Sequence, residues 1–267
     1  MNYNNQPRTA KEIISDTVRS DEFLRARNTN KDLGGVALLS VAAKEVADRQ
    51  TTENNGYDTP EIMQRRLISM LPSWLKSQKE LDLHRDEMTR AEKRTVLEPV
   101  VEFNHILRTM IDNEVYTSMP EITQFTQEAL LEMRASPHVL QYAKQQLRGV
   151  VDGMRHEIAS ESVLSDLPDV YDVRQGEGID DEMRGRDIYV EYKGEEIALD
   201  IKSRPERAAE ANARSSRSDY VAIWSGFEWE DFGNSLVPSK EQIAAKRAYW
   251  TAELARLHGE GTTAIAI

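Results

Sequence analysis

Cysteine is absent from the 267 residues of this chain. Its absence excludes disulfide bonds, thiolate zinc sites and iron–sulfur clusters, so any metal ion must take oxygen or imidazole ligands. The chain also has no apolar run long enough for a membrane-spanning helix. Its first residues are polar and lack the apolar segment of a signal peptide, so we expect an intracellular, cytoplasmic protein.

Basic residues are fewer than acidic residues in this chain. The chain has 34 Lys and Arg against 46 Asp and Glu, which gives a net charge of −12 and a pI near 5.0. A nucleic-acid-binding surface is usually basic, because it must neutralise phosphates. The balance therefore argues against a broadly basic protein, but it is compatible with a local basic groove beside acidic metal ligands.

Apolar residues recur at three- and four-residue spacing from about Thr9 to about Leu164, which predicts a mostly helical region. Breaks at 33–35 and 54–58 divide it, and Thr59-Pro60 suits the start of a helix. The pattern changes after Leu167-Pro168. We therefore expect a helical region over 1–140, which serves recognition, dimerisation or structure, and a second domain over 141–267.

The second domain has the patterns of a mixed sheet. Residues 188–192 alternate and are β-branched or aromatic, 193–195 form a turn, and 196–202 read as the second arm of a hairpin. The other expected elements are strands at 170–173 and 220–224, helices at 205–214 and 239–257, and a short edge strand at 262–267. The predicted class is α/β (α+β), with helices flanking the sheet and a large helical region before it.

Charged residues share one face of the second hairpin arm. Strand side chains alternate between faces, so Ile197, Leu199 and Ile201 should face a core while Asp200 and Lys202 point the other way. Asp187 begins the preceding strand, and the hairpin can fold it back beside Asp200.

Two neighbouring carboxylates repel unless a cation lies between them, and Mg²⁺ prefers hard oxygen ligands. This chemistry predicts a magnesium site at Asp187 and Asp200, where Mn²⁺ is expected to substitute. Lys202 could orient an attacking water molecule or offset charge that builds up on a phosphate.

Asp187, twelve intervening residues and then Asp200-Ile201-Lys202 resemble the motif of the PD-(D/E)XK, or restriction-endonuclease-like, nucleases. The predicted order of helix, hairpin, helix and strand is also similar, over roughly residues 145–240, and Arg186 stands where the motif has proline. The resemblance implies that Asp187 and Asp200 bind Mg²⁺ and that Lys202 serves hydrolysis. It also implies an acidic residue from the preceding helix, for which Glu157 is the first candidate and Glu161 the second.

The implied activity is Mg²⁺-dependent hydrolysis of DNA phosphodiester bonds, leaving 5′-phosphate and 3′-hydroxyl ends. The chain's size and helical addition resemble a type II restriction endonuclease, which implies a homodimer on a palindromic site. A Holliday-junction resolvase and a phage or defence nuclease are alternatives. One locally basic stretch could contact phosphates, or could be a solvated helix face: Ser203, Arg204, Arg207, Arg214, Ser215, Ser216 and Arg217.

Three other interpretations are open. Asp187 could simply begin a turn, with Asp200 and Lys202 as a solvated strand pair. A second triplet, Glu191-Tyr192-Lys193, has Asp180 and Asp181 upstream, although it lies at the tip of the hairpin. The chain could also be a non-catalytic DNA-binding protein or a helical interaction protein that retains the fold.

Overall fold

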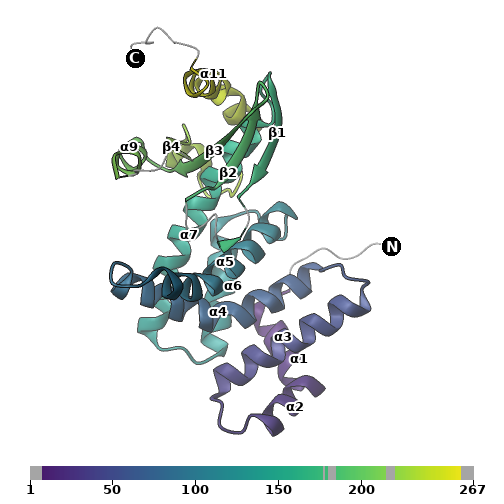
Figure 1. Ribbon diagram of the computed structural model, residues 1–267. Coiled ribbons are helices and arrows are strands. Elements are labelled where there is room, and N and C mark those ends of the chain that lie inside the picture. The colour runs from purple at the N-terminus through teal and green to yellow at the C-terminus, as the bar shows by residue number, and fades with distance from the viewer. Residues whose placement is uncertain (1–7, 177, 180–184, 215–219, 260–267) are drawn as a thin grey trace. The chain divides into compact units, whose positions relative to one another are not determined.

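Helices make up most of the structure, a computed structural model that describes residues 8–176, 178–179, 185–214 and 220–259 (Figure 1). Contacts between Cα atoms divide the chain into two compact units, Met1–Val150 and Val151–Ile267. The sequence pattern predicts a boundary between residues 140 and 141, whereas the structural division lies within the continuous helix α7 (Pro137–Leu164). None of the helices in these described ranges is both long and apolar enough to cross a membrane.

The first unit is built from helices. Before α7 they are α1 (Ala10–Arg19), α2 (Asp21–Thr29), α3 (Gly35–Glu53), α4 (Pro60–His84), α5 (Arg90–Asp112) and α6 (Met119–Glu132). The predicted break at 33–35 and the helix start at Thr59-Pro60 are confirmed, and the Thr59 hydroxyl accepts a hydrogen bond from Ile62 N at 3.3 Å. Ser20 divides the first helical segment in two because its side chain caps α2 through Phe23 N.

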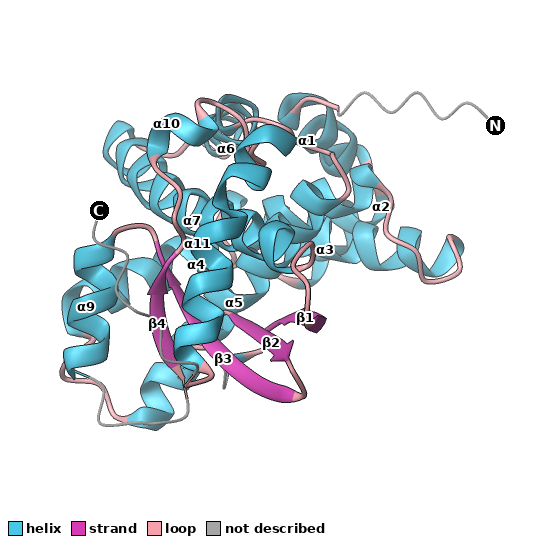
Figure 2. Ribbon diagram, turned by 90° about the horizontal axis from the view of Figure 1, so that it is seen from above, coloured by secondary structure: helices cyan, strands magenta, loops and turns pink. Residues whose placement is uncertain are grey.

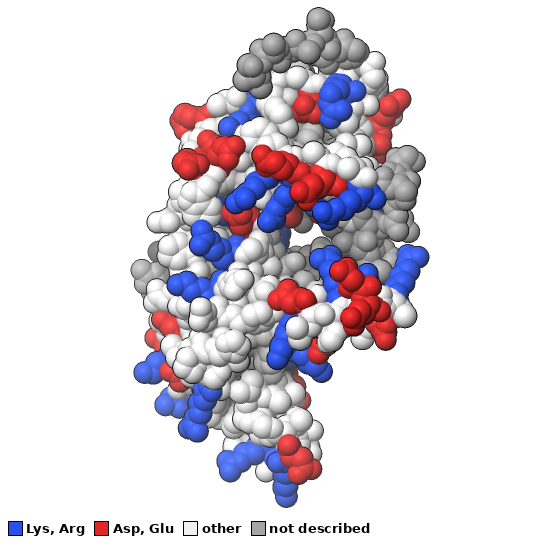
Figure 3. Space-filling view, turned by 90° about the vertical axis from the view of Figure 1, so that its left-hand side faces the viewer, with Lys and Arg blue, Asp and Glu red and all other residues white. Residues whose placement is uncertain are grey.

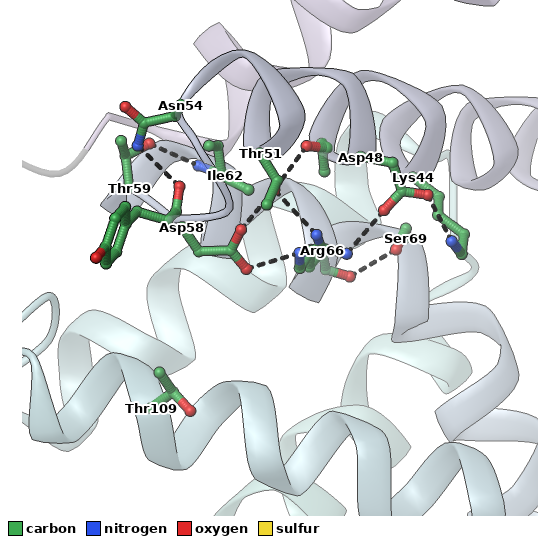
Figure 4. A network of polar contacts seen from close by, with 12 residues as sticks. Lys44, Asp48, Thr51, Asn54, Asp58, Thr59, Ile62, Arg66, Ser69 and Thr109 are labelled. Carbon is green, nitrogen blue, oxygen red and sulfur yellow. Dashed lines mark hydrogen bonds and ion pairs between the residues drawn. The ribbon is translucent and has the colours of Figure 1, made fainter.

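Packing between α4 and α5 centres on a stacked aromatic pair. The rings of Trp74 and Phe103 are parallel within 12°, with centroids 4.2 Å apart, and both side chains are fully buried. At the surface of the same unit, the Arg66 guanidinium of α4 donates to Asp48 and Thr51 of α3 and to Asp58 in the following loop (Figure 4). These contacts hold α3 against α4.

The second unit contains a four-stranded mixed sheet (Figure 2). Its elements after α7 are β1 (Val170–Gln175), β2 (Ile188–Tyr192), β3 (Glu195–Lys202), α9 (Pro205–Arg214), β4 (Val221–Trp224), α10 (Trp229–Phe232) and α11 (Lys240–Leu257). The strands lie in the order β1-β2-β3-β4, with β1, β2 and β3 antiparallel and β4 parallel to β3. The predicted mixed sheet with flanking helices is therefore confirmed, whereas the edge strand expected at 262–267 lies outside the described residues.

Side chains alternate on β3 as the sequence predicts. Leu199 and Ile201 are buried in the core of the unit, and Ile197 packs against that core. Helices α7 and α11 contribute Val163, Leu164, Trp250 and Leu254 to the same core. Helix α9 lies beside β4, where the Asn212 amide bonds to both the N–H and the carbonyl of Ala222 at 2.9 and 2.7 Å (Figures 1 and 2).

Candidate functional site

Asp187 extends the hairpin ladder beyond β2. Its N–H donates to Leu199 O at 2.8 Å, and its carbonyl accepts from Gly176 N at 2.8 Å. Its carboxylate Oδ2 also accepts a hydrogen bond from Ile201 N at 2.7 Å. Asp187 is therefore held by the backbone on three sides, unlike a residue that merely opens an exposed turn.

Asp200 lies on the opposite face of β3 from the core residues, yet it is only 4% exposed. Its Oδ1 forms an ion pair with the Lys202 ammonium group, whose side chain is 30% exposed. Because Asp200 is buried, the pair is not the solvated strand pair of the alternative interpretation. A buried carboxylate needs such a partner, since losing hydration without one is costly.

Gly185 packs directly against the Asp200 carboxylate. Its φ of +68° lies in the left-handed region, and a Cβ added there would be 3.4 Å from Asp200 Oδ2. A side chain at position 185 would therefore contact the carboxylate, and the positive φ would strain its backbone. The sequence contains a signal for this contact, the Gly-x-Asp spacing before β2.

The electrostatics of Asp187 bring Glu157 into the site. Loss of hydration raises the pKa of Asp187 well above its ordinary value, and the nearby charges of Glu157 and Asp200 raise it further. Lys202 and the hydrogen bond from Ile201 act in the opposite direction. Glu157 of α7, Asp187 before β2, and Asp200 and Lys202 of β3 therefore form one group of interacting charges, which we call the carboxylate cluster.

Glu161, the second candidate from α7, has a different neighbour. Its Oε2 lies 3.5 Å from the side-chain nitrogen of Gln175 on β1. Glu157, not Glu161, is among the groups that shift the pKa of Asp187. The packing of α7 on the sheet thus favours Glu157 as the acidic residue of the cluster.

The donor set of the cluster fits a hard divalent cation. The carboxylates of Glu157 and Asp200 both lie close enough to act on Asp187, and a cation would relieve this repulsion. Within the described ranges, however, no three His, Asp or Glu side chains are already arranged to hold a metal ion. This is compatible with Mg²⁺, which commonly binds one or two carboxylates and completes its coordination with water and substrate phosphate.

The rival triplet at the hairpin tip is less suited to such a site. Glu191 is exposed, Tyr192 is buried in the core, and Lys193 has a φ of +52° in the turn. Its proposed upstream carboxylates, Asp180 and Asp181, lie outside the described residues. The register through Asp200 therefore remains the better candidate.

The predicted phosphate-contacting residues are only partly described. Ser203 is half-buried, and Arg204, Arg207 and Arg214 are exposed on α9 and the segment that leads into it. Arg214 pairs with Glu210 at 3.3 Å. Ser215, Ser216 and Arg217 lie outside the described residues.

A buried polar pair beside the cluster was not predicted as functional. His156, the neighbour of Glu157 in α7, places its Nδ1 2.7 Å from the Ser225 hydroxyl. His156 is 4% exposed and Ser225 is fully buried. Burial lowers the pKa of His156, which favours the neutral imidazole. The sequence carries no local signal for this contact, because the two residues are far apart in the chain.

Comparison with known protein families, characterised proteins and solved structures found no match to the chain.

Proposed function

We propose that this protein is a Mg²⁺-dependent DNA endonuclease of the PD-(D/E)XK type. The observation that carries the proposal is the carboxylate cluster. The charges of Glu157 on α7 and of Asp200 and Lys202 on β3 all act on Asp187, and Asp200 and Lys202 form an ion pair. A structural role alone does not require two further carboxylates near Asp187, since each buried charge lowers stability unless it is compensated.

The order of elements around the cluster supports the same proposal. Helix α7 precedes the hairpin of β2 and β3, and α9 and β4 follow it. This is the order that the resemblance to restriction-endonuclease-like nucleases implies.

Asp187 and Asp200 would hold the metal ion, and Glu157 would contribute directly or through a water molecule. Bound Mg²⁺ supplies polarisation of the phosphate and a lowered pKa of bound water. The Ile201 N–H fixes one Asp187 oxygen, so that the carboxylate keeps its orientation. Lys202 is close enough to Asp200 to stand beside a bound phosphate, where its ammonium would offset developing negative charge.

Exposed arginines next to β3 would bind the DNA backbone. Arg204 and Arg207 lie two and five residues after Lys202 and are exposed. Acidic and basic side chains are interspersed on the face shown in Figure 3, and the chain's net charge is −12, so DNA would be bound by a few arginines and not by a broad basic surface. Phosphate contacts made by arginine would position the duplex without specifying its sequence.

Within this class, we favour a homodimeric type II restriction enzyme. The helical first unit would contribute residues for sequence recognition and for dimer contacts. A structure-specific nuclease of the Holliday-junction type, or a phage or defence nuclease, would use the same cluster. These subtypes differ in substrate rather than in the chemistry of cleavage.

A second candidate is a non-catalytic protein that binds DNA or another protein. The Asp200–Lys202 ion pair favours it, since this pair could stabilise the sheet without a metal ion. The two candidates differ in Mn²⁺ binding, which only the nuclease requires at Asp187 and Asp200. The heat of Mn²⁺ binding would be measured by calorimetry for wild type and for variants of Asp187 and Asp200. The same result for all of them would favour the second candidate.

Cleavage assays test the proposal directly. Supercoiled, linear, branched and single-stranded DNA would be incubated with Mg²⁺, Mn²⁺ or EDTA, using wild type and Asp200→Asn. Glu195→Gln is the matched control, because it replaces a largely exposed carboxylate on the same strand (side chain 69% exposed). We expect cleavage with either metal ion by wild type and by the control, and none by Asp200→Asn or with EDTA. No cleavage of any substrate by wild type would contradict the proposal.

A further inference from the structure

Ser225 lies at the centre of a buried network beside the carboxylate cluster. Its hydroxyl oxygen lies 2.7 Å from His156 Nδ1 and accepts a hydrogen bond from Phe227 N at 3.2 Å. Its carbonyl accepts from the Trp250 indole at 3.0 Å. Its own N–H donates to Lys202 O at 3.0 Å, which continues the pairing of β3 with β4 by one residue.

This network connects two members of the cluster. His156 precedes Glu157 on α7, and Ser225 is bonded to the backbone of Lys202. The path from Glu157 to Lys202 therefore runs through covalent bonds and two hydrogen bonds, and its two middle residues, His156 and Ser225, are buried. The two residues in the middle of this path, His156 and Ser225, carry no charge. The path can therefore fix the positions of its ends without changing the electrostatics of the cluster.

We propose that His156 and Ser225 are positioning residues that hold Glu157 of α7 and Lys202 of β3 at a set separation. This inference rests on the proposed nuclease function for its consequence, but the structural link itself can be tested independently. The hydroxyl of Ser225 accepts from Phe227 N, so its hydrogen is available to Nδ1 of a neutral imidazole. A shift of about 1 Å in a group that acts on the reacting phosphate can reduce the rate by roughly 100-fold.

Two replacements of His156 distinguish the effect of its hydrogen bond from the effect of the size of its ring. His156→Leu removes the bond to Ser225. His156→Asn keeps a polar atom at the position of Nδ1 and should restore the bond. Val163→Ala is the matched control, because Val163 is fully buried on the same helix and its side chain has no hydrogen-bonding group, so the bond between His156 and Ser225 stays in place.

The first measurement is hydrogen exchange of the backbone amides of residues 222–227, which does not depend on nuclease activity. We expect faster exchange in His156→Leu, with His156→Asn and Val163→Ala close to wild type. The second is steady-state cleavage. We expect kcat to fall at least tenfold in His156→Leu with KM within twofold of wild type, and to recover in His156→Asn.

The outcomes separate this inference from the proposed function. A wild-type protein that does not cleave DNA would overturn the nuclease proposal, while the exchange data would still test the link. An active wild type with His156→Leu indistinguishable from Val163→Ala in kcat and exchange would overturn the positioning role. Equal losses in His156→Asn and His156→Leu would also overturn it, because they would assign the effect to the ring and not to the hydrogen bond.

Discussion

The carboxylate of Asp187 accepts a hydrogen bond at 2.7 Å from the backbone N–H of Ile201, the residue between Asp200 and Lys202. Strand β3 thus orients Asp187, the acidic residue that directly precedes β2. The bond compensates only part of the cost of placing Asp187 beside Glu157 and Asp200, since the pKa of Asp187 remains raised. A cation bound at the cluster would offset this repulsion.

Asp187→Asn should change how the stability of the metal-free protein depends on pH. The folded state keeps the Asp187 proton above the ordinary pKa of 3.8. The stability that Asp187 contributes is therefore present below that pH and is lost as the pH rises through the raised folded value, by about 1.4 kcal/mol per pH unit. Asparagine cannot ionise but can still accept the bond from Ile201.

We therefore expect the melting temperature of Asp187→Asn, relative to wild type, to increase with pH. Thermal melts in EDTA at several pH values would measure this difference, in which the contributions of the other acids largely cancel. A difference that is constant between roughly pH 4 and pH 8 would contradict the raised pKa. Adding Mg²⁺ should stabilise wild type more than the variant.

Gly185→Ala should disturb Asp200 as well as the backbone. The left-handed φ of +68° costs a residue with a side chain about 1–2 kcal/mol. Gly194→Ala is the matched control, because Gly194 has a φ of +84° in the hairpin turn and an added Cβ would meet no atom within 4 Å. Both variants should lose similar stability in chemical unfolding, but only Gly185→Ala should lose Mn²⁺ affinity and cleavage. Equal Mn²⁺ affinity in the two variants would show that Gly185 does not act through Asp200.

Lys202→Met should separate the hydrolytic role of the lysine from metal binding. The substitution removes the ammonium group of Lys202. In the wild type this group offsets the charge of Asp200 and lowers the pKa of Asp187. We expect cleavage to fall by about 100- to 1,000-fold while Mn²⁺ still binds, because the carboxylates remain. Asp200→Asn should lose both properties. Calorimetry with Mn²⁺ and single-turnover cleavage would be compared, and a Lys202→Met protein that cleaves at the wild-type rate would exclude the lysine from catalysis.

Arg66→Met should weaken the first unit without affecting the cluster. Arg66 makes hydrogen bonds of 2.8–3.0 Å to Asp58, Asp48 and Thr51, and its side chain is 25% exposed. Loss of this network should cost about 1–2 kcal/mol, seen as faster amide exchange in α3 and α4. Lys44→Met is the control: its ion pair with Asp48 is more exposed (59% for the lysine side chain), so its loss should cost less than about 0.5 kcal/mol. Unchanged exchange in Arg66→Met would show that the network does not stabilise α3 against α4.

Local patterns in the sequence predicted elements of both units. Alternation along 196–202 identified which β3 residues enter the core, because a strand has a period of two whatever surrounds it. Capping residues such as Thr59 and Ser239 located helix starts, because a cap bonds within its own turn. The separation of Asp187 from Asp200 predicted their pairing through the hairpin, since a short turn determines the register.

Contacts between distant segments were decided only by tertiary structure. The sequence offered both Glu157 and Glu161, and the packing of α7 against the sheet brings the charge of Glu157 to Asp187. The bond between His156 and Ser225 joins residues 69 positions apart and has no local signature. Likewise, Asp200 is only 4% exposed, and Gly185 packs against its carboxylate from fifteen residues away in the chain. Periodicity and capping are encoded within a few residues, whereas burial and electrostatic neighbours depend on how whole elements pack.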